Sequence, residues 1–232
     1  MNFQEFIDPN PHHHELNPVL WDDDNHLRKN VRLQLLKIAR HFALYLDVPV
    51  LHLKDITLSG SSAGYNYSDY SDIDLHLVVS KTNGNDELFS AKKNLYNTQQ
   101  NLHIGKIPVE LYVQPADQPH HSAGIYSVLD NHWINEPEHV EPTTDTKDIK
   151  SKARNYAGKI NLAMRNNDIA QCRSVMAELK RLRQAGLVSG GEQSVENLAF
   201  KLLRARGSLD KLRKYITKLE SAELSLGEQH ED

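Results

Sequence analysis

The chain has 232 residues, of which 39% are hydrophobic and 25% are charged, as is typical of a globular protein with a substantial core. No apolar run approaches the roughly 20 residues of a membrane-spanning helix, and the start, MNFQEFIDPN, lacks the basic and apolar segments of a secretory signal, so we expect a cytoplasmic protein. A single cysteine, Cys172, excludes an internal disulfide and a cysteine-ligated zinc site.

Charge is distributed unevenly along the chain. Residues 1–146 contain 10 Lys and Arg against 20 Asp and Glu, residues 147–218 contain 17 against 6, and the last 14 residues contain none against 5. We therefore predict an acidic domain at 1–146, a basic helical domain at 147–222 and a disordered acidic tail at 223–232. The basic part suits a polyanion-binding surface, and equally a set of solvated helix faces.

The first thirty residues read as an irregular arm that contains three prolines and the triplet His12 to His14. Histidines bind metals, but in an exposed arm we interpret this triplet as incidental. The acids Asp22 to Asp24 favour the start of a helix. Apolar residues then recur at helical spacing at Val31, Leu35, Ile38, Ala39, Phe42 and Leu46. They predict a helix of about five turns that packs on a sheet.

Two predicted strands, 54–59 and 73–80, flank the segment GSSAGYNYSDYSDID, which runs from Gly60 to Asp74. Because strand side chains alternate between faces, Asp72 and Asp74 project from one side and the apolar residues between and after them from the other. Adjacent carboxylates repel each other unless a cation lies between them, and hard divalent cations prefer oxygen ligands. The segment therefore predicts a magnesium site.

A further acidic residue lies in the next predicted strand. A helix over residues 86–103 leads to the predicted strand 108–113, in which Glu110 and Tyr112 share one face. Glu110 therefore places a further carboxylate on the polar face of this strand. Asp117 follows Pro115 outside the apolar run, where a loop position is expected.

Two short strands joined around Asp130 and Asn131 are predicted next, because this residue pair tolerates a left-handed backbone. Tyr126 and Trp133 could stack on a base, but we expect them to anchor the hairpin to the core. Residues 136–145, rich in proline and acids, read as a linker.

The remainder predicts a bundle of three or four helices. Apolar stripes begin near Ile149, after Asp168 and after Ser194, two residues that can cap helices, and Gly207 separates the last helix from the one before it. The second helix is expected to end near Gly186. Cys172 lies in an apolar stripe, which indicates a small core residue rather than a nucleophile.

The Gly-Ser pair, the spacing to Asp-x-Asp and the later acidic strand resemble the signature of the DNA polymerase β-like nucleotidyltransferase superfamily, over about residues 53–114. The resemblance implies an α+β fold: a nucleotidyltransferase core with a small mixed sheet flanked by helices, followed by a helical bundle. One departure is that small stand-alone members often carry Arg and Gly where this chain has Gly64 and Tyr65. The stretches WDDDNHLRKNVRLQLL and SVENLAFKLLR are similar to predicted bacteriophage nucleotidyltransferases.

The resemblance also implies roles for residues. Asp72, Asp74 and Glu110 would hold two Mg²⁺ ions, with Mn²⁺ as an alternative, and Gly60, Ser61 and Ser62 would contact the phosphates of an NTP, ATP or CTP. A cation missing from the turn would come from elsewhere, and Lys201, Arg204 and Arg206 are the candidates; they are equally plausible as surface charges.

Three functions remain open from the sequence. The first is transfer of a nucleoside monophosphate to an RNA 3′ end, tRNA included, with the basic part following the phosphates. The second is AMP transfer to a protein hydroxyl, as in small antitoxin-type members. The third is a catalytically silent module that binds a nucleotide or a partner. The sequence does not decide the acceptor, the base or the oligomeric state.

Overall fold

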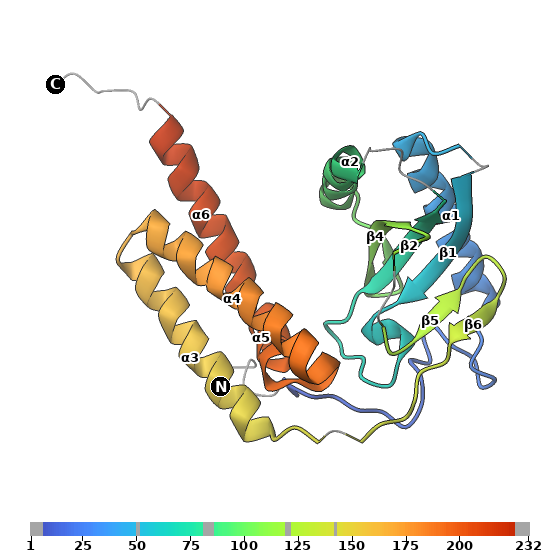
Figure 1. The fold of residues 1–232 in the computed structure, drawn as a ribbon, viewed down its shortest axis with the longest axis horizontal. Helices are drawn as coiled ribbons and strands as arrows, with labels where there is room; N and C mark the ends of the chain where they lie inside the picture. The colour runs from blue at the N-terminus through green and yellow to red at the C-terminus, as the bar shows by residue number, and fades with distance from the viewer. Residues whose placement is uncertain (1–6, 50–51, 81–85, 119–121, 142, 226–232) are drawn as a thin grey trace. The chain divides into compact units, whose positions relative to one another are not determined.

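The computed structural model describes residues 7–49, 52–80, 86–118, 122–141 and 143–225 (Figure 1). The chain divides into two compact units: residues 11–141 form one, and residues 142–232 with the first ten residues form the other. Each unit has its own hydrophobic core. Most of the predicted acidic tail lies outside the described residues, and its first two residues, Glu223 and Leu224, belong to the last helix.

The unit of residues 11–141 is an α+β structure built on a mixed sheet. Its helices and strands are α1 (Lys29–Leu46), β1 (Leu53–Ser59), the short 3₁₀ helix η3 (Ser61–Ala63), β2 (Ile73–Val79), α2 (Asp86–Gln99), β3 (His103–Ile104), β4 (Ile107–Pro115), β5 (Ile125–Ser127) and β6 (His132–Asn135). The six strands lie in the order β3-β4-β2-β1-β5-β6. Strands β2 and β4 are parallel, and the other neighbouring pairs are antiparallel.

Alternation along β2 separates an apolar face of the sheet from a polar one. Ile73, Leu75 and Leu77 are fully buried, and they share a core with Leu35 and Phe42 of α1. Burying each of these side chains stabilises the unit by about 1.5 to 3 kcal/mol. The intervening positions of β2 carry its polar side chains on the opposite face.

The prediction that Asp22 to Asp24 begin a helix is wrong. The carboxylate of Asp22 accepts the N–H groups of Asp24 and His26, at 3.1 and 2.9 Å, and Asn25 adopts a φ of 60°. Helix α1 begins only at Lys29 and has no side-chain cap. Aspartate favours both tight turns and helix starts, because its oxygens accept local N–H groups. In this segment it forms a turn.

The aromatic residues of the predicted hairpin anchor it to the core, as expected. Tyr126 is fully buried, and Trp133 stacks on Trp21 with ring centroids 4.6 Å apart. The indole N–H of Trp133 donates to the Asn25 carbonyl at 2.8 Å. Asn131 adopts the left-handed φ that the turn pair predicts. The described structure therefore does not offer these rings as a platform for a base.

The second unit is a helical bundle, drawn in yellow to red in Figure 1. Its helices are α3 (Thr146–Arg165), α4 (Ile169–Gly190), the 3₁₀ helix η4 (Gly191–Gln193), α5 (Val195–Ala205) and α6 (Ser208–Leu224). Asp168 and Ser194 cap α4 and α5 through their side chains, as predicted. Within the described residues, none of the helices combines the length and the apolar character required to cross a membrane.

Helix α4 does not end at Gly186, contrary to the prediction. A Cβ atom at this position would lie 2.5 Å from the Cβ of Glu196 and 2.7 Å from the Ser194 hydroxyl. Gly186 therefore allows the start of α5 to approach α4 closely. Glycine is tolerated inside a helix where close packing requires it. The sequence alone does not distinguish such a glycine from one that ends a helix.

Cys172 is expected to resist alkylation in the folded protein. Its side chain is fully buried, and burial raises the pKa of the thiol, so the reactive thiolate is scarce and inaccessible at pH 8. We expect a thiol reagent such as Ellman's reagent to label fewer than about one chain in ten under native conditions, and essentially every chain in denaturant. Rapid stoichiometric labelling of the native protein would contradict the core assignment.

Candidate metal and nucleotide site

Three carboxylates meet on the polar face of the sheet. Asp74 on β2 lies directly opposite Glu110 on the parallel strand β4, and Asp72 precedes β2 by one residue. Each of these side chains offers an oxygen within 4.8 Å of the oxygens from the other two, and all three residues are half-buried. The three residues that the sequence nominated as metal ligands are therefore brought together, whereas Asp117 is exposed in the turn after β4.

Gly60 lies against this cluster, where β1 ends beside Asp74. It adopts φ 75° and ψ −162°, a conformation that is essentially restricted to glycine. A Cβ atom here would lie 2.0 Å from the Oδ2 of Asp74. The turn backbone can approach the carboxylates this closely only because position 60 has no side chain.

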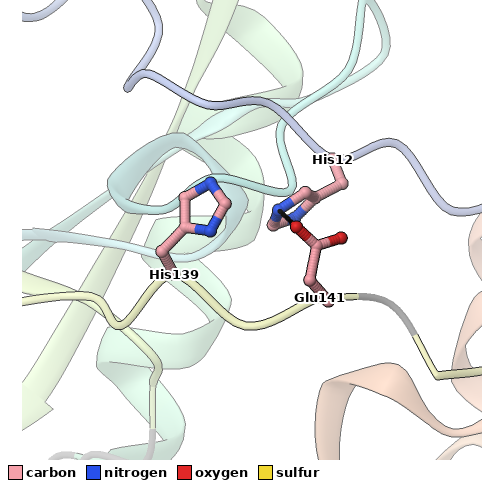
Figure 2. A group of neighbouring side chains, drawn as sticks. All are labelled: His12, His139 and Glu141. Atoms are coloured by element: carbon pink, nitrogen blue, oxygen red, sulfur yellow. Dashed lines mark ion pairs between the residues drawn. The ribbon is translucent and has the colours of Figure 1, made fainter.

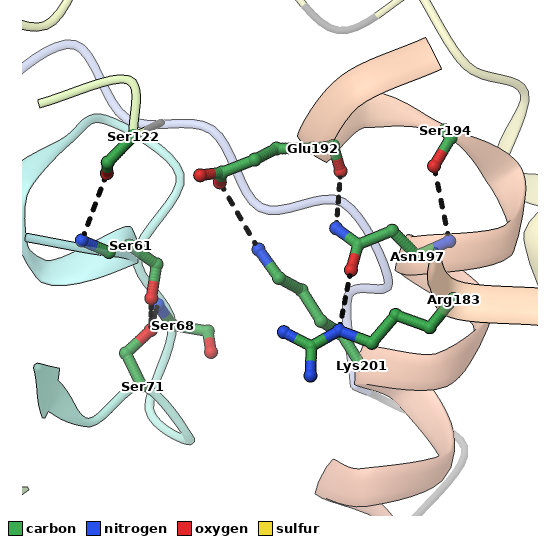
Figure 3. Close-up of polar contacts among 10 residues, drawn as sticks. Ser61, Ser68, Ser71, Ser122, Arg183, Glu192, Ser194, Asn197 and Lys201 are labelled. Atoms are coloured by element: carbon green, nitrogen blue, oxygen red, sulfur yellow. Dashed lines mark hydrogen bonds and ion pairs between the residues drawn. The ribbon is translucent and has the colours of Figure 1, made fainter. Parts of the chain in front are cut away.

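Hydroxyl groups hold the loop that follows this turn (Figure 3). The Ser61 hydroxyl lies 2.8 Å from that of Ser71, which also accepts the Ser68 N–H at 2.9 Å. The N–H of Gly60 donates to the Ser122 hydroxyl at 3.2 Å.

Ser62, predicted to contact phosphate, is fully buried instead. Its hydroxyl donates to the Asp72 carbonyl at 2.6 Å, and its own carbonyl accepts the Trp21 indole N–H at 2.9 Å. The side chain of Ser62 therefore holds the backbone of Asp72 in place, and Ser61 is the serine of the pair that has a half-exposed position. The sequence could not separate the two, because both lie in the same turn.

Tyr112 also belongs to the site, although the sequence predicted only that it shares a strand face with Glu110. It follows Glu110 on the same face of β4 and hydrogen-bonds to that carboxylate. Burial raises the pKa of Tyr112, and the charges of Asp74, Glu110 and Asp72 raise it further. The phenol therefore stays protonated and acts as a donor next to the carboxylates.

A lysine that the sequence analysis missed also reaches this face. The ammonium of Lys93 on α2 lies 4.8 Å from the centroid of the Tyr112 ring, and His76 stacks on the same ring at 4.8 Å. One helical turn after Lys93, the Asn97 side chain pairs with the N–H and carbonyl of Leu111 at 3.1 and 2.9 Å. Asn97 thus fixes α2 to β4 and brings Lys93 over the tyrosine.

Replacing Tyr112 with phenylalanine is expected to weaken Mg²⁺ binding about tenfold, the lower range for loss of a residue that orients a metal ligand. A phenyl ring has no O–H group to donate, so the Glu110 carboxylate loses this hydrogen-bond partner. Calorimetric titration with Mg²⁺ measures the change. Tyr45→Phe is the control, because the Tyr45 ring packs against Tyr96; equal affinities in all three proteins would contradict this role.

The basic candidates belong to the helical unit. On α5, Lys201 lies 3.6 Å from the Glu192 carboxylate, and nearby the guanidinium of Arg183 and the Glu192 carbonyl both bond to Asn197 (Figure 3). Lys201 is therefore already paired within its own unit. The roles of Lys201 and Arg204 toward phosphate remain predictions.

The residues present suit a hard divalent cation. Three carboxylates on one face provide oxygen donors only, which is the chemistry that Mg²⁺ and Mn²⁺ prefer. Their mutual repulsion is relieved when a cation binds among them. The arrangement can therefore bind metal and, through it, phosphate oxygens.

Comparisons with known proteins add little to this picture. No family model and no curated protein matches the chain. Among solved structures, one match is the STING-associated CdnE c-di-GMP synthase from Capnocytophaga granulosa, at 14% identity and a TM-score of 0.21, covering 85% of this chain and 83% of that one. A likeness at this level carries no argument about function.

Proposed function

We propose that this protein is a metal-dependent nucleotidyltransferase that transfers a nucleoside monophosphate from an NTP, ATP or CTP, to an acceptor hydroxyl. The observation that carries the proposal is the convergence of Asp72, Asp74 and Glu110 within 4.8 Å of one another, next to a glycine turn that touches Asp74. A group of metal-binding carboxylates alone is compatible with many functions. When such a group adjoins a tight glycine-serine turn, it suits a substrate that carries phosphates.

The carboxylates would hold the metals that the reaction needs. Asp72, Asp74 and Glu110 would together hold these ions. Bound ions would supply Lewis acidity for displacement at the α-phosphorus, with release of pyrophosphate. Tyr112 would keep Glu110 oriented through their hydrogen bond.

The turn and α2 would hold the phosphates. Ser61 has a half-exposed position, and its hydroxyl can exchange its Ser71 partner for a phosphate oxygen. Lys93 is a candidate for the cation that the turn lacks, because its ammonium lies over the ring of Tyr112, a residue of the carboxylate face. Lys201 and Arg204 remain further candidates.

An RNA 3′ end is the acceptor that we propose, with AMP transfer to a protein as the alternative enzyme reaction. The excess of Lys and Arg in residues 147–218 supports a surface that follows a phosphate backbone. Binding through such a surface should weaken steeply as salt rises.

Labelled nucleotides separate these possibilities. The protein is incubated with Mg²⁺, total cellular RNA, total cellular protein and each NTP labelled at the α-phosphate. We expect label on RNA, lost when the RNA 3′ ends are first oxidised with periodate, and lost with Asp74→Asn. Label on protein instead would support the alternative, and no label with any nucleotide would contradict an active transferase.

A further inference from the structure

A second group of metal-binding side chains lies in the unit of residues 11–141 and shares no residue with the three carboxylates. His12 comes from the N-terminal arm, and His139 and Glu141 come from the segment after β6 (Figure 2). Each contributes one ligand atom, and these atoms lie within 4.8 Å of one another. The two imidazole rings meet edge to face with centroids 4.5 Å apart.

The ring of His12 is buried without a hydrogen bond at its Nε2 atom. The side chain is 11% exposed, and Nε2 is inaccessible to water and has no hydrogen-bond partner. The Glu141 carboxylate lies 4.0 Å from this atom, which is beyond hydrogen-bonding distance. A buried polar atom without a partner is unfavourable and calls for an explanation, and an ion between His12 and Glu141 provides one.

His139 is prepared for metal binding by its hydrogen bond. Its Nε2 lies 3.1 Å from the His13 carbonyl oxygen. A carbonyl only accepts, so Nε2 carries the proton and the lone pair of the neutral ring is at Nδ1. Histidines that bind metals almost always donate their other ring N–H to a carbonyl or carboxylate in this way.

Two imidazoles and one carboxylate select a transition metal rather than magnesium. This is a donor set of zinc sites that keep one position open, whereas Mg²⁺ prefers oxygen ligands alone. Bonds of about 2.0 to 2.2 Å place tetrahedral ligands roughly 3.4 Å apart, so the group must contract slightly on binding. Glu141 is 77% exposed, and its flexible side chain can make that movement.

The arm that carries His12 is also attached to the loop after the glycine-serine turn. The N–H of His13 donates to the Tyr65 carbonyl at 2.8 Å, and the His13 ring stacks on Tyr67 at 3.9 Å. The ring of Tyr65 also packs against His139, at 4.8 Å. An ion held by His12 and His139 would therefore fasten the arm, this loop and the segment after β6 to one another.

We propose that His12, His139 and Glu141 bind one divalent transition-metal ion of the Zn²⁺ class, which clamps the N-terminal arm over the loop that contains Tyr65 and Tyr67. The expectation that the whole triplet is exposed is wrong, and the proposal gives His12 a role in place of an incidental one. His12 and His13 are half-buried, and the partners of His12 lie more than a hundred residues away in the sequence.

Zinc titration of the untagged protein tests the proposal, because a polyhistidine tag would itself bind the ion. The Asp72→Asn, Asp74→Asn double variant is used throughout so that the carboxylate site contributes little. We expect one equivalent of Zn²⁺ by calorimetry, no binding of Mg²⁺ at this site, and a visible spectrum of tetrahedral Co²⁺. In this background His12→Gln and His139→Gln should each weaken Zn²⁺ binding at least a hundredfold.

Two controls keep the result interpretable. His26→Gln replaces an exposed histidine of the same unit and should bind Zn²⁺ normally. Glu141→Gln changes an exposed side chain, so its expected tenfold or larger loss of affinity cannot arise from unfolding. Hydrogen exchange of the His13 amide should slow when Zn²⁺ is added. No stoichiometric Zn²⁺ binding, or unchanged binding in His12→Gln and Glu141→Gln, would overturn the proposal.

Discussion

Asp74→Asn is expected to reduce nucleotidyl transfer at least about 1,000-fold, equivalent to about 4 kcal/mol of transition-state stabilisation, without unfolding the protein. The carboxylate lies between Glu110 on the neighbouring strand and the backbone of Gly60, at the centre of the candidate site. Loss of its charge leaves the metals underbound, while the repulsion among the three carboxylates decreases. In EDTA the variant should therefore melt at the same temperature as the wild type or slightly higher.

Adding Mg²⁺ then distinguishes a metal ligand from a structural residue. The wild type should gain thermal stability by an amount that rises with the logarithm of its affinity for the ion, and Asp74→Asn should gain much less. Asp72→Asn should behave like it, and Glu110→Gln should be nearly as damaging to transfer. Asp117→Asn is the matched control, since Asp117 is an exposed carboxylate of the same unit. Wild-type turnover in Asp74→Asn would refute the site, and a mild effect of Glu110→Gln would move the third ligand elsewhere.

The facing of the carboxylates could be predicted because it depends on local alternation, and the resemblance to the nucleotidyltransferase signature implied that a third carboxylate belongs with the first two. Alternation along β2 places the side chain of Asp74 on the face opposite to those of Ile73 and Leu75. The register between the parallel strands β2 and β4 then determines that Glu110 lies opposite Asp74. Alternation of apolar residues within 108–113 likewise places Glu110 on the polar face of its strand. The sequence therefore favours Glu110 over Asp117, which lies outside that strand.

Residues that join the site from distant segments could not be predicted in this way. Lys93 reaches Tyr112 only because Asn97 bonds to the open edge of β4, and an amide that pairs with a strand edge has no signature in sequence. His12 meets His139 because the arm follows the loop at Tyr65 and Tyr67. Both cases depend on the tertiary path of the chain, which periodicity does not encode.

Local ambiguity caused the other errors. The oxygens of Asp22 cap a turn instead of a helix, and Gly186 permits close packing of helices instead of ending one. In each case one residue type serves two structures for the same physical reason. Only the packing around the residue decides between them.

Gly60→Ala is expected to reduce nucleotidyl transfer at least a hundredfold. It should also lower the free energy of unfolding by more than backbone strain alone would. A φ of 75° with ψ near −162° costs a residue with a side chain about 1 to 3 kcal/mol. In addition, the new methyl group would lie 2.0 Å from the Asp74 Oδ2, so either the carboxylate or the turn must move. Chemical denaturation and the labelled-nucleotide assay measure the two effects.

Gly191→Ala separates strain from displacement of the carboxylate. Gly191 adopts nearly the same backbone angles, φ 65° and ψ −156°, but a Cβ atom there would have nothing within 4 Å. It should therefore show the strain cost with transfer retained. If both variants lose the same stability and Gly60→Ala still transfers nucleotide and binds Mg²⁺ normally, the close approach of the turn to Asp74 is not required. If Gly60→Ala alone loses metal binding, the absence of a side chain at position 60 is what allows Asp74 to remain in the cluster.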